Sequence, residues 1–507
     1  MKKRLFSILL ALCMVLCLVP TTAFAESETE EPPVCSCETA CTAEAMNADC
    51  PICGAEDALP ENCARCAPPA DDAAVQPEGE VSDPQPEGKV SDPQPEGKVS
   101  DPQPETALTS LIGGSETAKE VSTEDELTKA IADVNFDTVK LAGDISISSS
   151  LTVSRTVTLD LNGKVLQMTG SGSVIKVESS GNLTLTDSNT TAKHKFMPNG
   201  KLWVLDDASG TEAVTGGVIT GGTGTDISTF GGTTWYCGGG ALIKNGGSLT
   251  MRGGNIIGCS AECGGGVCID SEQGQFSMSG GSIAGCVASD IGGGVFASGT
   301  FKMSGPAVIR SCTAESATQY VCGGGVYVNV SSSFEMSDTA IIEGCQAIST
   351  SSNSSNGGGV YVSSSSSFVM SNEAKIEGCQ AISNSSKSSK GGGVHLANNT
   401  KFTLSGSAVI QNCTATNSAN SGEAYGGGVS AACVKEITLA DSARIAGCAA
   451  ANGSGLYITG SLASPDAYGK LYANGGSVDG DVVLGDKDKN DGPCTITGPA
   501  GLCSMAK

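Results

Sequence analysis

Apolar and polar residues alternate in short runs through the middle of the chain, and the same runs recur from segment to segment. Residues 357–381 read GGGVYVSSSSSFVMSNEAKIEGCQA, and their apolar residues stand in three pairs spaced by two: Val360 with Val362, Phe368 with Met370, and Ala374 with Ile376. Spacing by two is the period of a β-strand with one buried face. The pattern therefore predicts three short strands separated by three corners in each repeat.

Seven repeats of this kind follow one another, and each begins with a glycine triplet and ends near a cysteine. The triplets begin at Gly238, Gly264, Gly292, Gly323, Gly357, Gly391 and Gly426. The cysteines are Cys259, Cys286, Cys312, Cys345, Cys379, Cys413 and Cys448. The distance from triplet to cysteine is always 20–22 residues, whereas the distance to the next triplet varies from 5 to 13. A constant segment followed by one of variable length predicts an all-β fold, a right-handed parallel β-helix with three strands in each level and one loop free to lengthen.

Stacking the repeats in register places like residues above one another. We expect a phenylalanine column (Phe276, Phe301, Phe334, Phe368, Phe402), a methionine column (Met251, Met278, Met303, Met336, Met370) and an isoleucine column (Ile256, Ile283, Ile309, Ile342, Ile376, Ile410, Ile445). The glycine triplets mark a tight corner that needs positive φ. A second corner in the left-handed region is expected before each cysteine, where glycine stands in five repeats and Ser311 and Asn412 in the other two.

The cysteines of the repeats form a further predicted column. Each is followed two residues later by alanine, as in Cys379 and Ala381, and we interpret Cys-x-Ala as two inward-facing small residues. Stacked cysteines would have nearly parallel Cβ vectors about one level apart, whereas a disulfide requires Cβ atoms about 3.8 Å apart. Buried free thiols are therefore favoured, with disulfides and a metal-binding column as alternatives. Cys237, Cys263 and Cys322 precede triplets and are better disulfide candidates, Cys237 with Cys263 above all.

The repeats belong to a larger domain, for which we expect residues 107–507, with the glycine repeats at 238–455. Near 122–134 the sequence STEDELTKAIADV predicts a short amphipathic helix, with Ser122 or Thr123 as N-cap and with Leu127, Ala130, Ile131 and Val134 on its apolar face. Only short strands are expected after it. A single helix ahead of a stack of strands predicts a cap over the end of the β-helix.

Three further segments precede that domain. Residues 1–25 have a basic start, a short apolar run and AFA at 23–25, which predicts a secretory signal peptide. Residues 26–70 are cysteine-rich. Residues 71–106 contain the repeat QPEGKVSDP and predict a proline-rich, disordered linker.

The cysteine-rich segment contains two Cys-x-x-Cys pairs, Cys50 with Cys53 and Cys63 with Cys66. Four such cysteines suit tetrahedral Zn²⁺, which makes zinc the one cofactor that the sequence suggests. Exported proteins commonly contain disulfides instead, and three more cysteines lie upstream. Zinc and disulfides therefore both remain open for this segment.

The charge of the chain restricts its partners. The formal net charge is −25, which disfavours nucleic acid and anionic membrane surfaces. No segment after the signal peptide is long and apolar enough to span a membrane, so we expect a secreted or cell-surface protein.

Candidate catalytic groups are few. The two histidines, His194 and His395, have no second histidine or repeated carboxylate beside them in the sequence, and an outward surface position is expected for His395. Asp206 and Asp207 suit a turn. Alternating acidic residues near the end could bind Ca²⁺, but a solvated loop is favoured because a closing glutamate is missing; these residues are Asp479, Asp481, Asp486, Asp488, Asn490 and Asp491.

The triplet followed by Val, then F-x-M-S and I-x-x-C-x-A, resembles the repeats of polymorphic outer-membrane-protein and adhesin-type β-helices. In this chain a third glycine replaces the alanine of their GGA motif, and cysteine stands near the position of their asparagine. TVTLDLNGKVL resembles the first levels of pectin-lyase-like domains, and the cysteine-rich head with a proline-rich spacer is similar to surface proteins of gut clostridial bacteria.

The resemblance implies an adhesin-like or structural surface protein that binds a glycan or a host surface protein without catalysis. We expect the variable loops to stack on one edge and to carry the binding. The alternative is a polysaccharide lyase or glycoside hydrolase on the same fold, which would require acidic side chains of neighbouring levels to converge near an Arg or Lys. The sequence does not show such a cluster, and it identifies no ligand.

Overall fold

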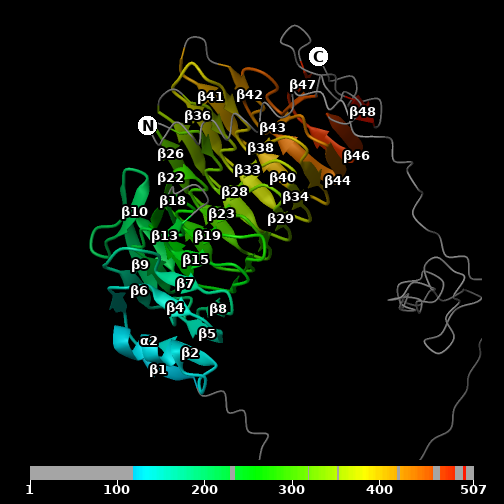
Figure 1. Ribbon diagram of the computed structural model, residues 1–507. Helices are drawn as coiled ribbons and strands as arrows, with labels where there is room; N and C mark the ends of the chain where they lie inside the picture. The colour runs from blue at the N-terminus through cyan, green and yellow to red at the C-terminus, as the bar shows by residue number, and fades with distance from the viewer. Residues whose placement is uncertain are drawn as a thin grey trace, which may run out of the picture. The chain divides into compact units, whose positions relative to one another are not determined.

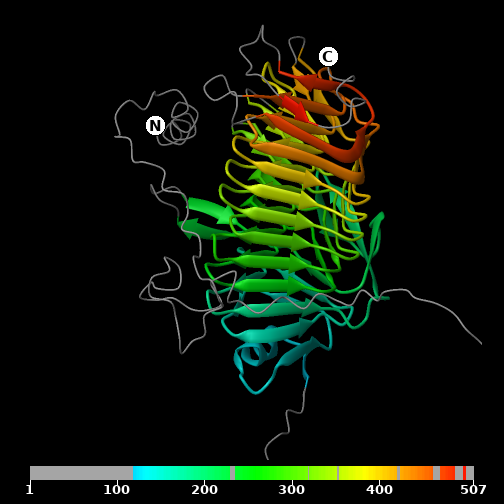
Figure 2. The ribbon, with the colours of Figure 1, turned by 90° about the vertical axis from the view of Figure 1, so that its right-hand side faces the viewer.

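The chain folds as a right-handed parallel β-helix, as the repeats predict (Figure 1). The computed structural model describes residues 118–228, 234–317, 319–350, 353–419, 423–460, 469–485 and 495–497. All of these belong to the second of two compact units, Gly113–Lys507. The levels of the β-helix follow one another along a single axis, from α2 (Glu124–Ala132) at one end towards β48 (Thr495–Thr497) at the other (Figure 2).

The first face of the β-helix is an 11-stranded parallel sheet whose strands begin at, or directly after, the glycine triplets in the repeat region. Consecutive levels pair in register, so that Val326 lies beside Val360 and Val360 beside Val394. Its strands are β4 (Leu151–Val153), β7 (Ile175–Val177), β15 (Ala241–Ile243), β19 (Val267–Ile269), β23 (Val295–Ala297), β28 (Val326–Val328), β33 (Val360–Val362), β38 (Val394–Leu396), β43 (Val429–Ala432), β45 (Leu456–Thr459) and β47 (Val482–Leu484).

The second face is formed by the strands that carry the phenylalanines and methionines. These strands form one column of a 22-stranded sheet, and Phe334 of one level pairs with Phe368 of the next. The strands of this column are β1 (Lys119–Val121), β2 (Thr138–Leu141), β5 (Thr156–Asp160), β8 (Asn182–Thr186), β16 (Ser248–Met251), β20 (Gln275–Met278), β24 (Thr300–Met303), β29 (Ser333–Met336), β34 (Ser367–Met370), β39 (Lys401–Leu404), β44 (Glu436–Ala446), β46 (Lys470–Val478) and β48.

The isoleucine strands form a second column of the same 22-stranded sheet. The two columns join at β44, which pairs with both β39 and β40. The strands of this column are β3 (Ile145–Ile147), β6 (Val165–Met168), β12 (Val218–Thr220), β17 (Asn255–Ile257), β21 (Ser282–Ala284), β25 (Val308–Arg310), β30 (Ile341–Glu343), β35 (Lys375–Glu377) and β40 (Val409–Gln411).

The variable segments also form strands, which the sequence analysis missed. After the cysteine the chain runs outward as one strand, and in the repeats from Cys312 to Cys413 it returns as a shorter second strand; we call this extension the arm. The arm strands of successive levels pair in a 12-stranded sheet. They are β13 (Thr225–Ser228), β14 (Thr234–Cys237), β18 (Ser260–Cys263), β22 (Val287–Ile291), β26 (Thr313–Ser316), β27 (Val321–Cys322), β31 (Gln346–Ser349), β32 (Ser355–Asn356), β36 (Gln380–Ser383), β37 (Ser389–Lys390), β41 (Thr414–Asn417) and β42 (Ala424–Tyr425).

A small antiparallel sheet is inserted before the repeats. It consists of β9 (Lys193–Asn199), β10 (Leu202–Leu205) and β11 (Glu212–Thr215). Trp203 of β10 is buried, and its amide donates to the carbonyl of Gly285 at 3.1 Å. The guanidinium of Arg310 lies 4.8 Å from the centre of the Trp203 ring. A β-carbon on Gly285 would overlap the indole, so glycine at this corner admits the insertion.

The helix α2 covers the N-terminal end of the β-helix, as predicted (Figure 2). Thr123 is its N-cap and accepts a hydrogen bond from the amide of Glu126 at 3.3 Å. Leu127, Ala130 and Ile131 are buried under it. The prediction for Val134 is wrong, because the helix ends at Ala132 and Val134 is 77% exposed.

The predicted columns fill the interior of the β-helix. The phenylalanine rings from Phe276 to Phe402 are fully buried and stack with centroid distances of 5.0, 4.7, 4.7 and 5.2 Å. The methionine and isoleucine columns are buried in the same core. Because strands in a sheet lie about 4.8 Å apart, ring stacking at this distance follows directly from the register.

The glycine triplets have two distinct physical roles. Only the first glycine of each triplet has positive φ, for example 65° at Gly357. A β-carbon on Gly358 would overlap the backbone of Gln380, and one on Gly359 would lie 2.7 Å from the carbonyl oxygen of Gly393. The sequence analysis assigned the whole triplet to positive φ, whereas the second and third glycines are required by close approach of neighbouring backbone.

The second corner adopts the left-handed conformation in all seven repeats, as predicted. The residue before the cysteine has φ of 60° at Gly344 and 63° at Gly378. Ser311 and Asn412 adopt the same conformation, with φ of 51° and 55°. The corner is thus fixed by the path of the backbone, and non-glycine residues are tolerated there.

Candidate functional site

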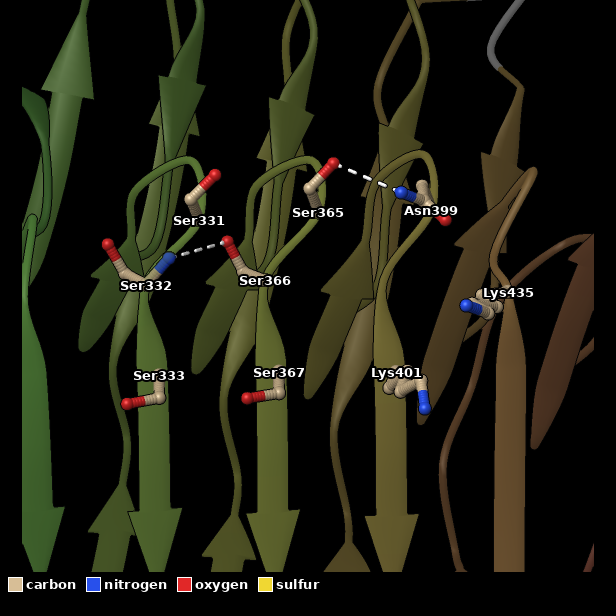
Figure 3. Close-up of a pocket in the computed structure, with 9 residues that line it drawn as sticks. All are labelled: Ser331, Ser332, Ser333, Ser365, Ser366, Ser367, Asn399, Lys401 and Lys435. Carbon is tan, nitrogen blue, oxygen red and sulfur yellow. Dashed lines mark hydrogen bonds between the residues drawn. The ribbon is translucent and has the colours of Figure 1, made fainter. Parts of the chain in front are cut away.

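A groove lined by polar side chains crosses the turns between the valine strands and the phenylalanine strands (Figure 3). It has a volume of about 300 Å³. We call it the serine groove because six of its nine lining residues are serines from two successive levels. Its lining residues are Ser331, Ser332, Ser333, Ser365, Ser366, Ser367, Asn399, Lys401 and Lys435. It therefore presents hydroxyl, amide and ammonium groups along the axis of the β-helix.

Successive turns of the serine groove have the same shape, because each contains a residue in the left-handed conformation at the same position. Ser331, Ser365 and Asn399 have φ of 59°, 60° and 58°, and their side chains are exposed at the tips of successive turns (Figure 3). The side chain of Asn399 donates to Oγ of Ser365 at 3.1 Å. This turn column is regular enough to hold several polar groups at one spacing, about 4.8 Å.

The middle serine of each turn holds the turn in place. Ser366 is 4% exposed, and its hydroxyl donates to the carbonyl of Asn329 at 2.6 Å. It also accepts from the amide of Ser332 at 3.3 Å. Buried hydroxyls with such partners link one level to the next, while Ser333 and Ser367 at the strand starts face the groove (Figure 3).

Two lysines form the far end of the serine groove. Lys401 stands in the same column as Ser367 and forms an ion pair with Glu436 at 3.8 Å. Lys435 is exposed, points back towards the preceding level in Figure 3, and has no carboxylate partner within the described parts of the chain. None of the nine lining residues is acidic. The groove thus carries positive charge in a chain of net charge −25.

His395 lies in an aromatic column on the outer face of the first sheet. The prediction of a surface position is wrong, because His395 is only 5% exposed. Its ring stacks on Tyr361 at 5.4 Å, and Tyr361 stacks on Tyr327 at 5.0 Å. Burial, assisted by the charge of Lys390, lowers the pKa of His395 to about 3. Its Nδ1 atom has no hydrogen-bond partner among the described residues.

The arm covers this outer column, which explains the burial of His395. At earlier levels Cys237 and Cys263 of the arm strands pack on Leu242 and Cys268 of the outer column. Alternation alone placed residue 395 correctly on the outward side of its strand. It gave no information about a second layer on that side.

A second, smaller cavity of about 240 Å³ lies at the C-terminal end of the arm. Tyr425 and Tyr457 line it, with ring centroids 4.7 Å apart and tilted by 41°. Ser430 interrupts the aromatic column at the level after His395. The two tyrosine rings are nearly buried, 7% exposed at Tyr425 and 8% at Tyr457.

The cysteine column is buried and its thiols are free, as favoured from the sequence. Cys345 and Cys379 are both fully buried at adjacent levels. Burial raises the pKa of the Cys345 thiol well above its usual value. Because all seven cysteines of the column are buried, they serve as small apolar side chains of the core. Five of the seven alanines two residues later are buried too, whereas Ala261 and Ala450 are partly exposed, and Ala381 packs inside the arm and not in the main core.

The disulfide predicted between Cys237 and Cys263 is absent, and Cys322 is also a free thiol. Cys237 and Cys263 pair directly across parallel strands, which gives their Cβ vectors the unfavourable geometry argued above for the column. The thiols of Cys263 and Cys268 hydrogen-bond to Cys237 and lower its pKa to about 5. No group of three residues suited to a metal ion is found in the described part of the chain.

His194 and the two aspartates belong to the inserted sheet. His194 is 7% exposed, and its Nε2 lies 3.1 Å from the carbonyl oxygen of Gly163. A single carboxylate lies beside it in space, with Oδ2 of Asp207 3.7 Å from Nδ1. Asp206 forms the predicted turn, and hydrogen bonds from Ser209 lower the pKa of Asp206. This position is structural and lies apart from the serine groove.

Several predicted residues cannot be placed. Residues 1–25, 26–70 and 71–106, with the zinc candidates Cys50, Cys53, Cys63 and Cys66, lie outside the described residues, so zinc and disulfides both stay predictions there. Asp486, Asp488, Asn490 and Asp491 also lie outside. Of the remaining acidic residues, Asp479 forms an ion pair with Arg444.

The sequence analysis did not identify the serine groove. The signal was present as serine runs at the same place in successive repeats, 331–333 and 365–367, followed by Asn399 and Lys401. Binding was instead expected in the variable loops. The arm strands bury part of the variable segments and leave other parts exposed. Binding by these segments stays a prediction.

Comparison with known proteins gives little further information. No known protein family matches the chain, and no curated protein matches it. Two solved structures are similar. The first, "L. reuters 100-23 SRRP", is 14% identical to this chain with a TM-score of 0.31, and the match covers 75% of this chain and 98% of that chain. The second, "L. reuteri 53608 SRRP", is 14% identical to this chain with a TM-score of 0.20, and the match covers 73% of this chain and 100% of that chain. The fold assignment above rests on strand register and not on this likeness.

In the described part of the chain, no helix has the length and apolar character that a membrane crossing requires. The one helix there, α2, has nine residues and is acidic in its first turn.

Proposed function

We propose that this protein is a secreted or cell-surface β-helix with an adhesin-like role, which binds a glycan in the serine groove without catalysis. The observation that carries the proposal is the groove itself, with hydroxyl and amide groups repeated at the spacing of the levels. Sugar hydroxyls both donate and accept hydrogen bonds, as serine hydroxyls do, and a polymer that lies along the axis meets the same groups at each level.

The chemistry of the groove favours binding over bond cleavage. Glycoside hydrolysis generally uses a pair of carboxyl groups on either side of the scissile bond. The nine residues of the groove include no carboxyl group, and Glu436 is held by Lys401 at its margin. The expected signal peptide of residues 1–25 supports export, where a glycan partner would be met.

Glycan-array binding of the full chain tests the proposal, followed by titration of the best ligand. Ser367→Tyr would place a ring in the groove, and Gln275→Tyr is its control because Gln275 stands in the same strand column three levels earlier. We expect Ser367→Tyr to weaken binding about tenfold or more, a change of about 1.4 kcal/mol. Gln275→Tyr should leave affinity unchanged.

If the two variants bound the glycan with equal affinity, the serine groove would not be its binding site. Release of unsaturated or reducing sugar ends by the purified chain, at a rate above that of buffer alone, would contradict a role without catalysis and support the alternative of a polysaccharide lyase or hydrolase.

A further inference from the structure

The lysine-bearing end of the serine groove has a charge pattern that the rest of the groove lacks. Lys401, Glu436 and Lys470 stand at successive levels of one strand column, because Lys401 pairs with Glu436 and Glu436 with Lys470. Lys435 lies beside this column at the groove. Three lysines thus accompany one glutamate at this end of the column, which gives it an excess of formal positive charge, and Lys401 is the one of them with an ion pair to Glu436 in the described part of the chain.

We propose that the serine groove selects an anionic glycan, a sugar polymer whose residues carry carboxylate or sulfate groups; this inference rests on the function proposed above. Lys435 and Lys401 pair with the acidic groups, and Ser331, Ser333, Ser365 and Ser367 hydrogen-bond the neighbouring sugar hydroxyls. Hydrogen bonds between ammonium and carboxylate or sulfate are stronger than those between neutral groups. The lysines thus determine selectivity, while the serines position the chain.

The overall charge of the protein does not prevent this binding. At physiological ionic strength charges are screened over about 8 Å, so the net charge of −25 acts weakly on a polymer already in contact with the lysines. The same negative charge discourages contact elsewhere on the surface. An acidic polymer is therefore directed to this end of the groove.

The geometry of the column also suits a repeating polyanion. Lys401 and Lys470 are separated by two levels, about 10 Å at the spacing of parallel strands. Lys401 and Lys470 can meet two acidic groups spaced about 10 Å apart on one extended chain, while Glu436 of the level between them is paired with Lys401. A single small anion would use only one of them.

Binding of the full chain to matched polymers tests this inference. Dextran and dextran sulfate differ only in sulfate, and esterified alginate and alginate differ in free carboxylate, so the two pairs separate sulfate from carboxylate as the recognised group. We expect the anionic member of at least one pair to bind about tenfold more tightly. The affinity should fall as salt is raised from 50 to about 500 mM, because the pairs are screened.

The variant Lys401→Gln/Lys435→Gln should abolish this preference, with affinity for the anionic polymer falling about tenfold. Lys302→Gln is the matched control. The side chains of Lys302 and Lys401 are both 54% exposed and both pair with a glutamate, but Lys302 lies outside the groove. The control should change affinity less than twofold.

The outcomes separate the two proposals. Binding of dextran and dextran sulfate with equal affinity, unaffected by the double variant, would overturn the selection of anions and leave glycan binding intact. Equal losses in the double variant and in Lys302→Gln would also overturn it, because they indicate diffuse attraction. Absence of binding to any glycan on the array and to all four polymers would overturn the proposed function itself.

Discussion

The interior of the β-helix and the interior of the arm are both buried, but they are filled in different ways. The β-helix is filled by columns of large side chains, of which Phe334 and Phe368 stack at 4.7 Å. The arm is filled by Ala347, Ala381 and similar small residues, and by serines such as Ser355 and Ser389, which are fully buried. Each repeat therefore contributes both a strongly apolar part of the β-helix, which we call the body, and an arm of low apolar content.

The physical consequence is an uneven distribution of stability. A buried phenylalanine removes far more apolar surface from water than an alanine does, at about 25 cal/mol per Å². The arm depends mainly on strand pairing, because its interior contributes little apolar burial.

Phe334→Ala should destabilise the β-helix by about 4 kcal/mol, because it leaves a cavity in the middle of the phenylalanine column. Ala347→Gly removes a buried methyl group from β31, the arm strand of the same repeat, and should cost about 1 kcal/mol. Urea denaturation of both variants measures the difference. Equal losses would mean that the arm is as important for stability as the body.

Gly358→Ala should cost about 3 kcal/mol, because its new β-carbon would overlap the backbone of Gln380, where the arm leaves the body. The control is Gly378→Ala at the left-handed corner, where nothing lies within 4 Å and φ is 63°. Only conformational strain applies there, which costs about 1 kcal/mol. If Gly378→Ala lowered the unfolding free energy more than Gly358→Ala, close approach of the backbone would not be the stronger of the two requirements for glycine.

His395 should make the protein sensitive to acid. Its pKa of about 3 in the folded state lies below the ordinary histidine pKa of 6.5, so the unfolded chain binds more protons between these values. The stability contribution is complete above pH 6.5 and is lost as pH falls towards 3. At pH 5 the expected loss is about 2 kcal/mol.

His395→Tyr continues the aromatic column of Tyr327 and Tyr361 without this titration. Its unfolding free energy should change by about 2 kcal/mol less than that of the wild type between pH 7 and pH 5. Urea titrations at the two pH values give this quantity. An identical acid loss in both proteins would show that other groups cause it.

Ser389→Ala should stabilise the arm by about 1 kcal/mol, because the Ser389 hydroxyl is buried with no partner in the described part of the chain. Ser383→Ala is its control and should destabilise by about 1 kcal/mol, since the Ser383 hydroxyl donates to the carbonyl of Lys387 at 3.0 Å. Hydrogen exchange of the arm amides reports the local effect. If both variants changed the stability of the arm in the same direction, Ser389 and Ser383 would not differ in hydrogen bonding as described.

The body of the fold could be predicted from the sequence because its signal is repeated at every level. Phe368 and Ile376 recur with their neighbours in fixed order, so register follows from alignment of the repeats. Even the left-handed corner was predictable at Ser311 and Asn412, because glycine holds the same position in other repeats.

The outer layer and the groove were less predictable for physical reasons. The strand Gln380–Ser383 is too polar for alternation to reveal its buried face, so the arm was taken as a loop. His395 was consequently assigned to the surface. Ser365 and Lys435 come from different levels, and their proximity depends on the turn geometry and not on spacing in one repeat.

The central claim is that successive repeats occupy successive levels in register, which both cores and the serine groove require. Spin labels at Gln275 and Lys401, introduced through a non-canonical amino acid, test it by pulsed electron resonance. The two positions lie on one strand column four levels apart. We predict one narrow backbone separation of about 19 Å, and a broad distribution or a separation well beyond this value would contradict the account.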